Sequence, residues 1–162
     1  MFTVADIRDI AVQIERNGEA AYRQAAQVVK DPVVSAIFTW MAEEEKRHGQ
    51  WFSMIGIEEP LNEEQQEAEK MGRRLLQEMV ADQTFSLDRE MLLNTPDFDG
   101  ALAQAQTFEQ DTILFYEFLS SLVEEEDVRQ QLQIIIGEEK RHIEQLAEIK
   151  KAGPGSRNLA LV

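Results

Sequence analysis

The chain has 162 residues, enough for one domain with one sizeable core, and no apolar run approaches the ~18 residues of a membrane span. Its 16 Lys and Arg stand against 31 Asp and Glu, and the formal charge of −15 excludes a general binder of nucleic acid or anionic membranes, which needs a basic face. Cysteine is absent, which excludes disulfides, thiolate metal sites and thiol catalysis, and because the N-terminus also lacks a signal-peptide pattern we expect a cytoplasmic protein.

Apolar residues recur at helical spacing and predict an all-α fold, a four-helix bundle built from two antiparallel hairpins. Asp31-Pro32 separates the first two helices, since Asp suits an N-cap and Pro the first turn. The acidic turn Glu124-Glu125-Glu126 separates the last two, and Gly153-Pro154-Gly155 ends the fourth. The predicted helices cover residues 3–30, 32–55, 98–123 and 127–152.

The segment between the hairpins, residues 57–97, predicts a helical crossover. Residues 61–81 are amphipathic, and a shorter helix is possible at 86–93. A link of ~20 helical residues spans ~30 Å, which would carry the chain along the bundle or supply surface for a dimer. We therefore expect one bundle domain over 1–152 and a C-terminal tail over 153–162, which is either loose or docked on a neighbour.

The two hairpins repeat each other with an offset of 94 residues. Glu15 corresponds to Glu109, and the run Glu44-Glu45-Lys46-Arg47-His48 recurs unchanged at 138–142. No gap is needed between residues 14 and 52. The repeat predicts a pseudo-two-fold bundle in which equivalent residues face each other and favour a paired site.

The repeat contains the residues best suited to bind metal. Each histidine of the chain follows a glutamate by three residues, so a carboxylate and an imidazole share one helix face, and the neighbouring apolar positions place that face in the core. One further core-facing glutamate stands 30 residues before each pair. Ionised glutamates are rarely buried without a partner. Protonation could relieve the buried charge, and so could two divalent cations, which would balance four carboxylates. The predicted metal ligands are Glu15, Glu45, His48, Glu109, Glu139 and His142.

Donor chemistry leaves the metal open among iron, manganese and zinc. Tyr22 and Tyr116, two turns beyond Glu15 and Glu109, either donate hydrogen bonds to ligand carboxylates or are only core aromatics. Neighbouring charged residues are expected on the surface, and the large aromatic residues in the core. The expected surface residues are Glu43, Glu44, Glu138, Lys46, Arg47, Lys140 and Arg141, and the expected core includes Trp40, Trp51 and the Phe residues.

The doubled pattern Glu, Glu-x-x-His resembles the ferritin-like di-iron carboxylate proteins, and among them most closely the rubrerythrin family. The resemblance covers residues 3–56 and 98–152. It implies two iron ions per chain, with Glu45 and Glu139 as bridging, catalytic carboxylates, and with Glu15 and Glu109 as terminal ligands. His48 and His142 would be the nitrogen ligands. The implied activity is reduction of hydrogen peroxide or O2 with oxidation of the ferrous pair.

Two departures from the family pattern matter. The chain has no four-cysteine rubredoxin site, so electrons would come from a separate donor, either a rubredoxin-like protein or a reductase. The second glutamate that follows the third-helix ligand by one turn in rubrerythrins is Thr112 here, matched by Gly18 in the first helix. This puts the redox-linked ligand exchange of the family, and a peroxidase built on it, in question.

Three functions stay open at this stage. The first is a di-iron redox enzyme, expected as a homodimer that binds neither nucleic acid nor membrane. The second is ferroxidation in iron storage or iron handling, which the acidic composition mildly favours. The third is a non-catalytic helical module in which the metal is structural, although structural sites usually close their coordination.

Overall fold

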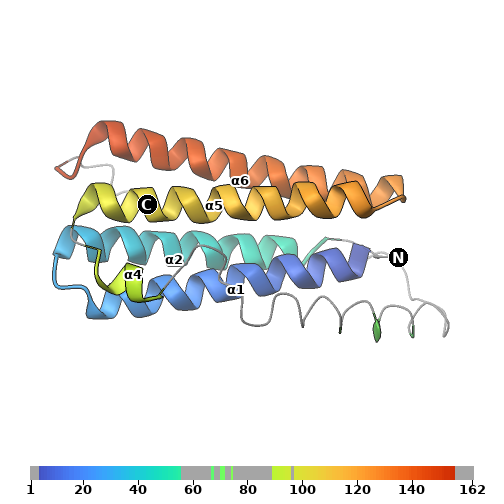
Figure 1. The fold of residues 1–162 in the computed structure, drawn as a ribbon, viewed down its shortest axis with the longest axis horizontal. Helices are drawn as coiled ribbons and strands as arrows, with labels where there is room; N and C mark the ends of the chain where they lie inside the picture. The colour runs from blue at the N-terminus through green and yellow to red at the C-terminus, as the bar shows by residue number, and fades with distance from the viewer. Residues whose placement is uncertain are drawn as a thin grey trace.

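The computed structural model describes residues 4–55, 67, 70, 71, 74, 89–95 and 97–155. Four long helices run alongside one another over the length of the molecule, and a short helix lies beside the first (Figure 1). The described residues contain no strand. The helices are α1 (Val4–Val28), α2 (Pro32–Phe52), α4 (Arg89–Leu93), α5 (Phe98–Leu122) and α6 (Glu126–Ala152).

Aspartates cap the start of two helices, and a glycine ends the last one. The Asp31 carboxylate accepts hydrogen bonds from the amides of Val33 and Val34, at 2.8 and 3.2 Å, and caps α2. Asp97 caps α5 through the Gly100 amide at 2.8 Å. Gly153 ends α6 with φ 78°, a left-handed conformation that glycine adopts without a steric penalty. The predicted helix breaks are therefore confirmed.

The internal repeat appears in the helix boundaries. Helices α1 and α5 are both 25 residues long, and their first residues, Val4 and Phe98, stand 94 positions apart. Helices α2 and α6 also start 94 positions apart, at Pro32 and Glu126. Helix α2 ends at Phe52. The Ser53 amide still bonds four residues back, to the Gly49 carbonyl, whereas the Met54 and Ile55 amides bond only three residues back, to Trp51 and Phe52.

The helices pack as two antiparallel hairpins, which confirms the predicted four-helix bundle. Helix α1 packs along α2 and α5 along α6, and the hairpins join through α2 with α5 and through α1 with α6 (Figure 1). The core that they enclose is aliphatic and aromatic, and α4 adds the buried Leu92 beside α1. The largest fully buried side chains include Tyr22, Phe38, Phe52, Phe108 and Tyr116.

Little of the predicted crossover is described. Helix α4 lies within the shorter helix expected at 86–93, and residues 67, 70, 71 and 74 are helical and exposed. The remainder of the expected helix at 61–81, the course of the link and tail residues 156–162 lie outside the described residues. Among the described helices, none combines the length and the apolar character that crossing a bilayer requires.

Three predicted side-chain environments are wrong. Trp51 is 39% exposed and Phe118 is 52% exposed, although both were expected in the core. Phe118 lies two residues, roughly 200° of helical rotation, beyond the buried Tyr116, so it points to the opposite side of α5. Glu44, expected in solvent, is only 4% exposed because it lies under the guanidinium of Arg47.

Candidate metal centre

All six predicted ligands are buried in the middle of the bundle. They come from four helices: one glutamate each from α1 and α5, and a Glu-x-x-His pair each from α2 and α6. The six side chains belong to residues that are between 0 and 6% exposed, so bulk water does not solvate their charge. The six are Glu15, Glu45, His48, Glu109, Glu139 and His142.

The first half of the centre surrounds His48. Its Nδ1 atom lies 3.7 Å from Glu15 Oε2 and 3.7 Å from Glu139 Oε2. Both distances are too long for a hydrogen bond, yet two ligand atoms about 2.1 Å from one ion lie roughly 3–4 Å apart. This half therefore combines two residues of the first hairpin with one glutamate of the second.

The second half surrounds His142 and contains the residues equivalent to those of the first. His142 Nδ1 lies 2.7 Å from Glu109 Oε1, although the two atoms do not form a hydrogen bond. Single ligand atoms of Glu45, Glu109 and His142 lie within 4.8 Å of one another, and so do those of His48, Glu139 and His142. Adding 94 to the Glu15 and His48 numbers, and exchanging Glu139 for Glu45, converts the first half into the second. The two imidazole rings are 5.1 Å apart between centroids, so the halves are neighbours.

The oxygen and nitrogen atoms of the cluster are better placed to coordinate cations than to hydrogen-bond to one another. Because carboxylates and neutral imidazoles have few hydrogens to share, much of the cluster is left without a hydrogen-bond partner among the described residues. Mixed carboxylate and imidazole donors suit iron, manganese or zinc. The unpartnered atoms are Glu15 Oε2, Glu45 Oε1, both carboxylate oxygens of Glu109, Glu139 Oε1, His48 Nδ1 and both ring nitrogens of His142.

Electrostatics shows the cost of the cluster without cations. Burial, followed by the charge of neighbouring carboxylates, raises the pKa of Glu15, Glu109 and Glu139 well above the ordinary value. Burial raises the pKa of Glu45 to about 7, and the electrostatic interaction with the His142 ring opposes the rise. Burial, followed by repulsion from His142, lowers the pKa of His48 to about 3, which keeps its imidazole neutral and ready to donate a lone pair.

Two residues beside the ligands were predicted only as departures from a family pattern. Gly18 leaves room for Glu45, since a Cβ at position 18 would lie 2.9 Å from Glu45 Oε2. At the equivalent place in α5, Thr112 is 1% exposed and its hydroxyl has no hydrogen-bond partner among the described residues. The sequence signal for Gly18 was a glycine inside a long amphipathic helix. The sequence carried no such signal for Thr112.

Tyr22 and Tyr116 are fully buried near the carboxylates. Burial, with the charges of Glu15, Glu45 and Glu109 adding to it, raises the pKa of both phenols well above the ordinary value. Neither hydroxyl has a hydrogen-bond partner among the described residues, so neither donates to a carboxylate in this arrangement. Their role beside the ligands stays a prediction.

The basic residues of the repeated motif lie on the surface in ion pairs, as predicted. Lys46 lies 4.0 Å from Glu43, and Lys140 lies 3.5 Å from Glu117, which links α5 to α6. The two arginines pair with the glutamate three residues earlier on their own helix, which is Glu44 for Arg47 and Glu138 for Arg141. All four basic side chains are 48–67% exposed, so the ligand cluster itself holds no fixed positive charge from them.

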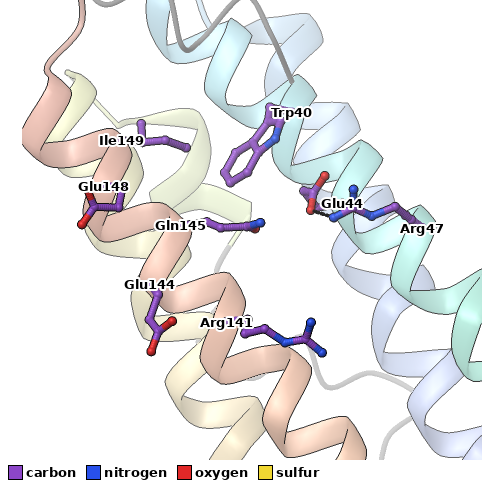
Figure 2. Close-up of a pocket in the computed structure, with 8 residues that line it drawn as sticks. All are labelled: Trp40, Glu44, Arg47, Arg141, Glu144, Gln145, Glu148 and Ile149. Carbon is purple, nitrogen blue, oxygen red and sulfur yellow. Dashed lines mark hydrogen bonds and ion pairs between the residues drawn. The ribbon is translucent and has the colours of Figure 1, made fainter.

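A groove of about 620 Å³ separates α2 from α6 beside the centre (Figure 2). Trp40 forms one of its walls, and the Trp40 ring meets the His142 ring edge-on at 5.6 Å between centroids. The Glu44–Arg47 pair lies on the same wall of α2 (Figure 2). The Trp40 indole therefore lies between this groove and His142, one of the predicted ligands. The residues facing it from α6 are Arg141, Glu144, Gln145, Glu148 and Ile149.

Comparison with known proteins agrees with this geometry. No curated protein and no solved structure matches the chain significantly. The family model of rubrerythrin matches residues 6–92, which is more than half of the chain and includes Glu15, Glu45 and His48. The match spans the first hairpin, the link and α4, and the 94-residue repeat extends the same motif to the second hairpin. The chain therefore belongs to the rubrerythrin family of ferritin-like di-iron proteins.

Proposed function

We propose that this protein is a di-iron oxidoreductase that reduces hydrogen peroxide or O2. One observation carries the proposal: four buried carboxylates and two buried imidazoles form two equivalent half-sites, with eight donor atoms lacking a hydrogen-bond partner among the described residues. Glu15, His48 and Glu139 would hold one ion, and Glu109, His142 and Glu45 the other. Glu45 and Glu139 reach across from the opposite hairpin, which supports them as bridging ligands.

In this proposal the protein residues bind the two iron ions, exclude bulk water from them and balance their charge. Four carboxylates balance two divalent cations, and the neutral His48 adds no charge of its own. Without cations, burial favours the protonated carboxyls, so metal binding releases their protons. When bound, the iron pair would supply one electron per ferrous ion and open positions for the oxidant.

Reconstitution under anaerobic conditions tests the proposal. Purified protein should bind two ferrous ions per chain, and addition of hydrogen peroxide should oxidise both faster than it oxidises free ferrous ion. Glu45→Ala and His48→Ala should lose metal and activity, whereas Lys46→Ala beside them should keep both. Wild-type protein that binds the metal but gives no acceleration would contradict a redox role.

The proposed partners follow from what the chain lacks. Without cysteine it has no rubredoxin site of its own, so a separate rubredoxin-like protein or reductase would return the electrons in the cytoplasm. We also propose a homodimer. The outer face of α5 presents Leu114, Phe118 and Leu122, one per turn and each 52–54% exposed.

Iron handling is the second candidate, and the charge of −15 favours it because an acidic surface attracts ferrous ions. Ferroxidation for storage needs a shell of many subunits around a cavity. Molecular mass in solution separates the two functions: a 12- or 24-subunit assembly supports storage, and a dimer supports the oxidoreductase. A metal with no redox role would instead show a fall in melting temperature on chelation and no reaction with peroxide.

A further inference from the structure

A small pocket between α1 and α2 leads toward the metal centre. Its volume is about 170 Å³, room for a few water-sized molecules. Glu45, one of the proposed bridging ligands, forms part of its wall while remaining 1% exposed. The pocket therefore reaches the outer side of the cluster at the Glu45 side chain. It is lined by Val12, Arg16 and Glu19 from α1 and by Glu45, Lys46, Gly49, Gln50 and Ser53 from α2.

The internal repeat provides a comparison within the same molecule. Residue 19 is a glutamate beside the pocket, but its equivalent in α5, Ile113, is 2% exposed and part of the core. Residue 49 is glycine, but its equivalent in α6, Ile143, is a partly buried residue packed against the core. Two isoleucines in the second hairpin thus stand at the positions that a glutamate and a glycine hold in the first.

Helix packing brings α1 and α2 close together beside the pocket. A Cβ at position 49 would lie 3.3 Å from Glu15 Cβ, so glycine lets the two helices approach closely at the level of the cluster. Glu19, on the α1 side of the pocket, pairs with Arg23 at 2.7 Å.

The charges around the pocket suit an uncharged molecule better than a cation. The lining holds two basic residues, Arg16 and Lys46, against two acidic ones, Glu19 and Glu45, so its formal charges cancel. A pocket without net charge does not attract a ferrous ion, whereas hydrogen peroxide or O2 needs no such attraction. Gln50 and Ser53 add an amide and a hydroxyl that can hydrogen-bond to a small polar molecule.

We infer that the pocket between α1 and α2 is the access site through which a small uncharged oxidant reaches the cluster, beside Glu45. This inference rests on the proposed di-iron function and adds the side of the bundle from which the oxidant enters. The two halves of the centre are equivalent in their ligands but not in their access. Oxidant arrives from the side of the first hairpin, where Gly49 and Glu19 replace the isoleucines of the second.

Two tryptophan substitutions at repeat-equivalent positions test the inference. Gln50→Trp fills the α1/α2 pocket, and Glu144→Trp places the same side chain at the equivalent position of α6, in the groove between α2 and α6. Nitric oxide, an uncharged probe of the size of O2, is mixed with the anaerobic ferrous protein and its binding is followed by absorption. The rate should fall at least tenfold in Gln50→Trp and less than twofold in Glu144→Trp.

Each remaining outcome decides the matter. Equal rates in both variants and the wild type, or slowing only in Glu144→Trp, would overturn the inference. A metal uptake slowed as much as nitric oxide binding would assign the pocket to the ion instead and also overturn it. Glu19→Ile, which copies the second hairpin, should reproduce the slowing if Gln50→Trp fails to fold.

The same measurements separate this inference from the proposed function. Wild-type protein that binds nitric oxide through the pocket but does not consume peroxide would contradict the function alone. Peroxide consumed at the wild-type rate by a folded, metal-loaded Gln50→Trp would contradict the access site alone. A protein that binds no metal would overturn both, because the pocket would then lead to no reactive centre.

Discussion

The carboxylate of Glu45 lies directly over Gly18, so close that a Cβ on residue 18 would stand 2.9 Å from Oε2 and 3.2 Å from Cδ. Real Cβ atoms do not approach other atoms so closely, and the ring of Phe108 is only 3.2 Å away on the other side. Glycine is therefore needed here for space, inside a helix where every residue except proline has a higher helix propensity. A ligand carboxylate from α2 occupies the room that α1 leaves.

Gly18→Ala should displace Glu45 and weaken metal binding. The new methyl group must push the carboxylate away, so we expect the ferrous affinity to fall at least tenfold, measured by competition with a chelator. Gly137→Ala on α6 is the matched control, because a Cβ there meets nothing within 4 Å. It should raise the stability by about 0.5–1 kcal/mol and leave metal affinity unchanged. Equal metal affinity in both variants would show that Glu45 has room to move.

The metal-free protein should lose stability as the pH rises. Glu15, Glu109 and Glu139 have pKa values raised well above the ordinary 4.5, and Glu45 is raised to about 7, so the folded state holds protons that the unfolded chain has released. Their contribution is complete below about pH 4.5 and is lost as the pH passes 7 for Glu45. The lowered pKa of His48, about 3, opposes this with a single proton.

Thermal melting of chelator-treated protein between pH 5 and pH 8 checks this prediction. The melting temperature should fall across that range, and Glu45→Gln should flatten the fall because an amide does not ionise. A melting temperature that rises steadily from pH 5 to pH 8 would contradict the assigned burial of the four carboxylates.

Metal removal should matter most at high pH, where the carboxylates are ionised and repel one another. An ion present at 100 times its dissociation constant stabilises the fold by about 2.7 kcal/mol per site. The melting temperature at pH 8 should therefore drop clearly on chelation, and less so at pH 5, where protons replace the cations. Calorimetry with and without chelator at both pH values measures the difference, and equal drops would argue against proton and metal competing for one site.

Thr112→Val should stabilise the metal-free protein. The Thr112 hydroxyl is buried and without a hydrogen-bond partner among the described residues, and an unsatisfied buried polar group costs about 1–3 kcal/mol. Valine has nearly the same shape and no hydroxyl. Chemical denaturation measures the change in the free energy of unfolding. A loss of more than 1 kcal/mol would mean that the hydroxyl has a partner in solution.

Phe118→Glu should convert a dimer into a monomer. Phe118 lies between Leu114 and Leu122 on the outer face of α5 and is 52% exposed, so the change costs no core packing. Light scattering after size exclusion measures the mass, and Leu93→Glu, also exposed at 38% but on α4, is the control. A wild-type protein that is already monomeric at high concentration would contradict the proposed homodimer.

The ligand cluster was predictable because two regularities agree in the sequence. The apolar periodicity of each helix fixes which side faces inward, and the 94-residue repeat shows that Glu15 and Glu109, or His48 and His142, occupy equivalent places on those faces. Helix boundaries followed from capping and helix-breaking residues, with Asp31 before α2 and Gly153 after α6. Periodicity and capping are local, since each depends on residues a few positions apart, and the repeat needs only a comparison of two stretches of the sequence.

Other features depend on which residues of a neighbouring helix face a given helix, and periodicity does not specify those residues. The sequence alone determined the inward face that carries the six predicted ligands, because helical spacing repeats every 3.6 residues whatever the neighbours are. Only the tertiary structure decided that His48 meets Glu139 of the other hairpin, that Glu44 is buried under Arg47, and that the first hairpin is open beside Gly49. The reason is physical: these outcomes depend on the distance and rotation between helices, which long-range packing sets.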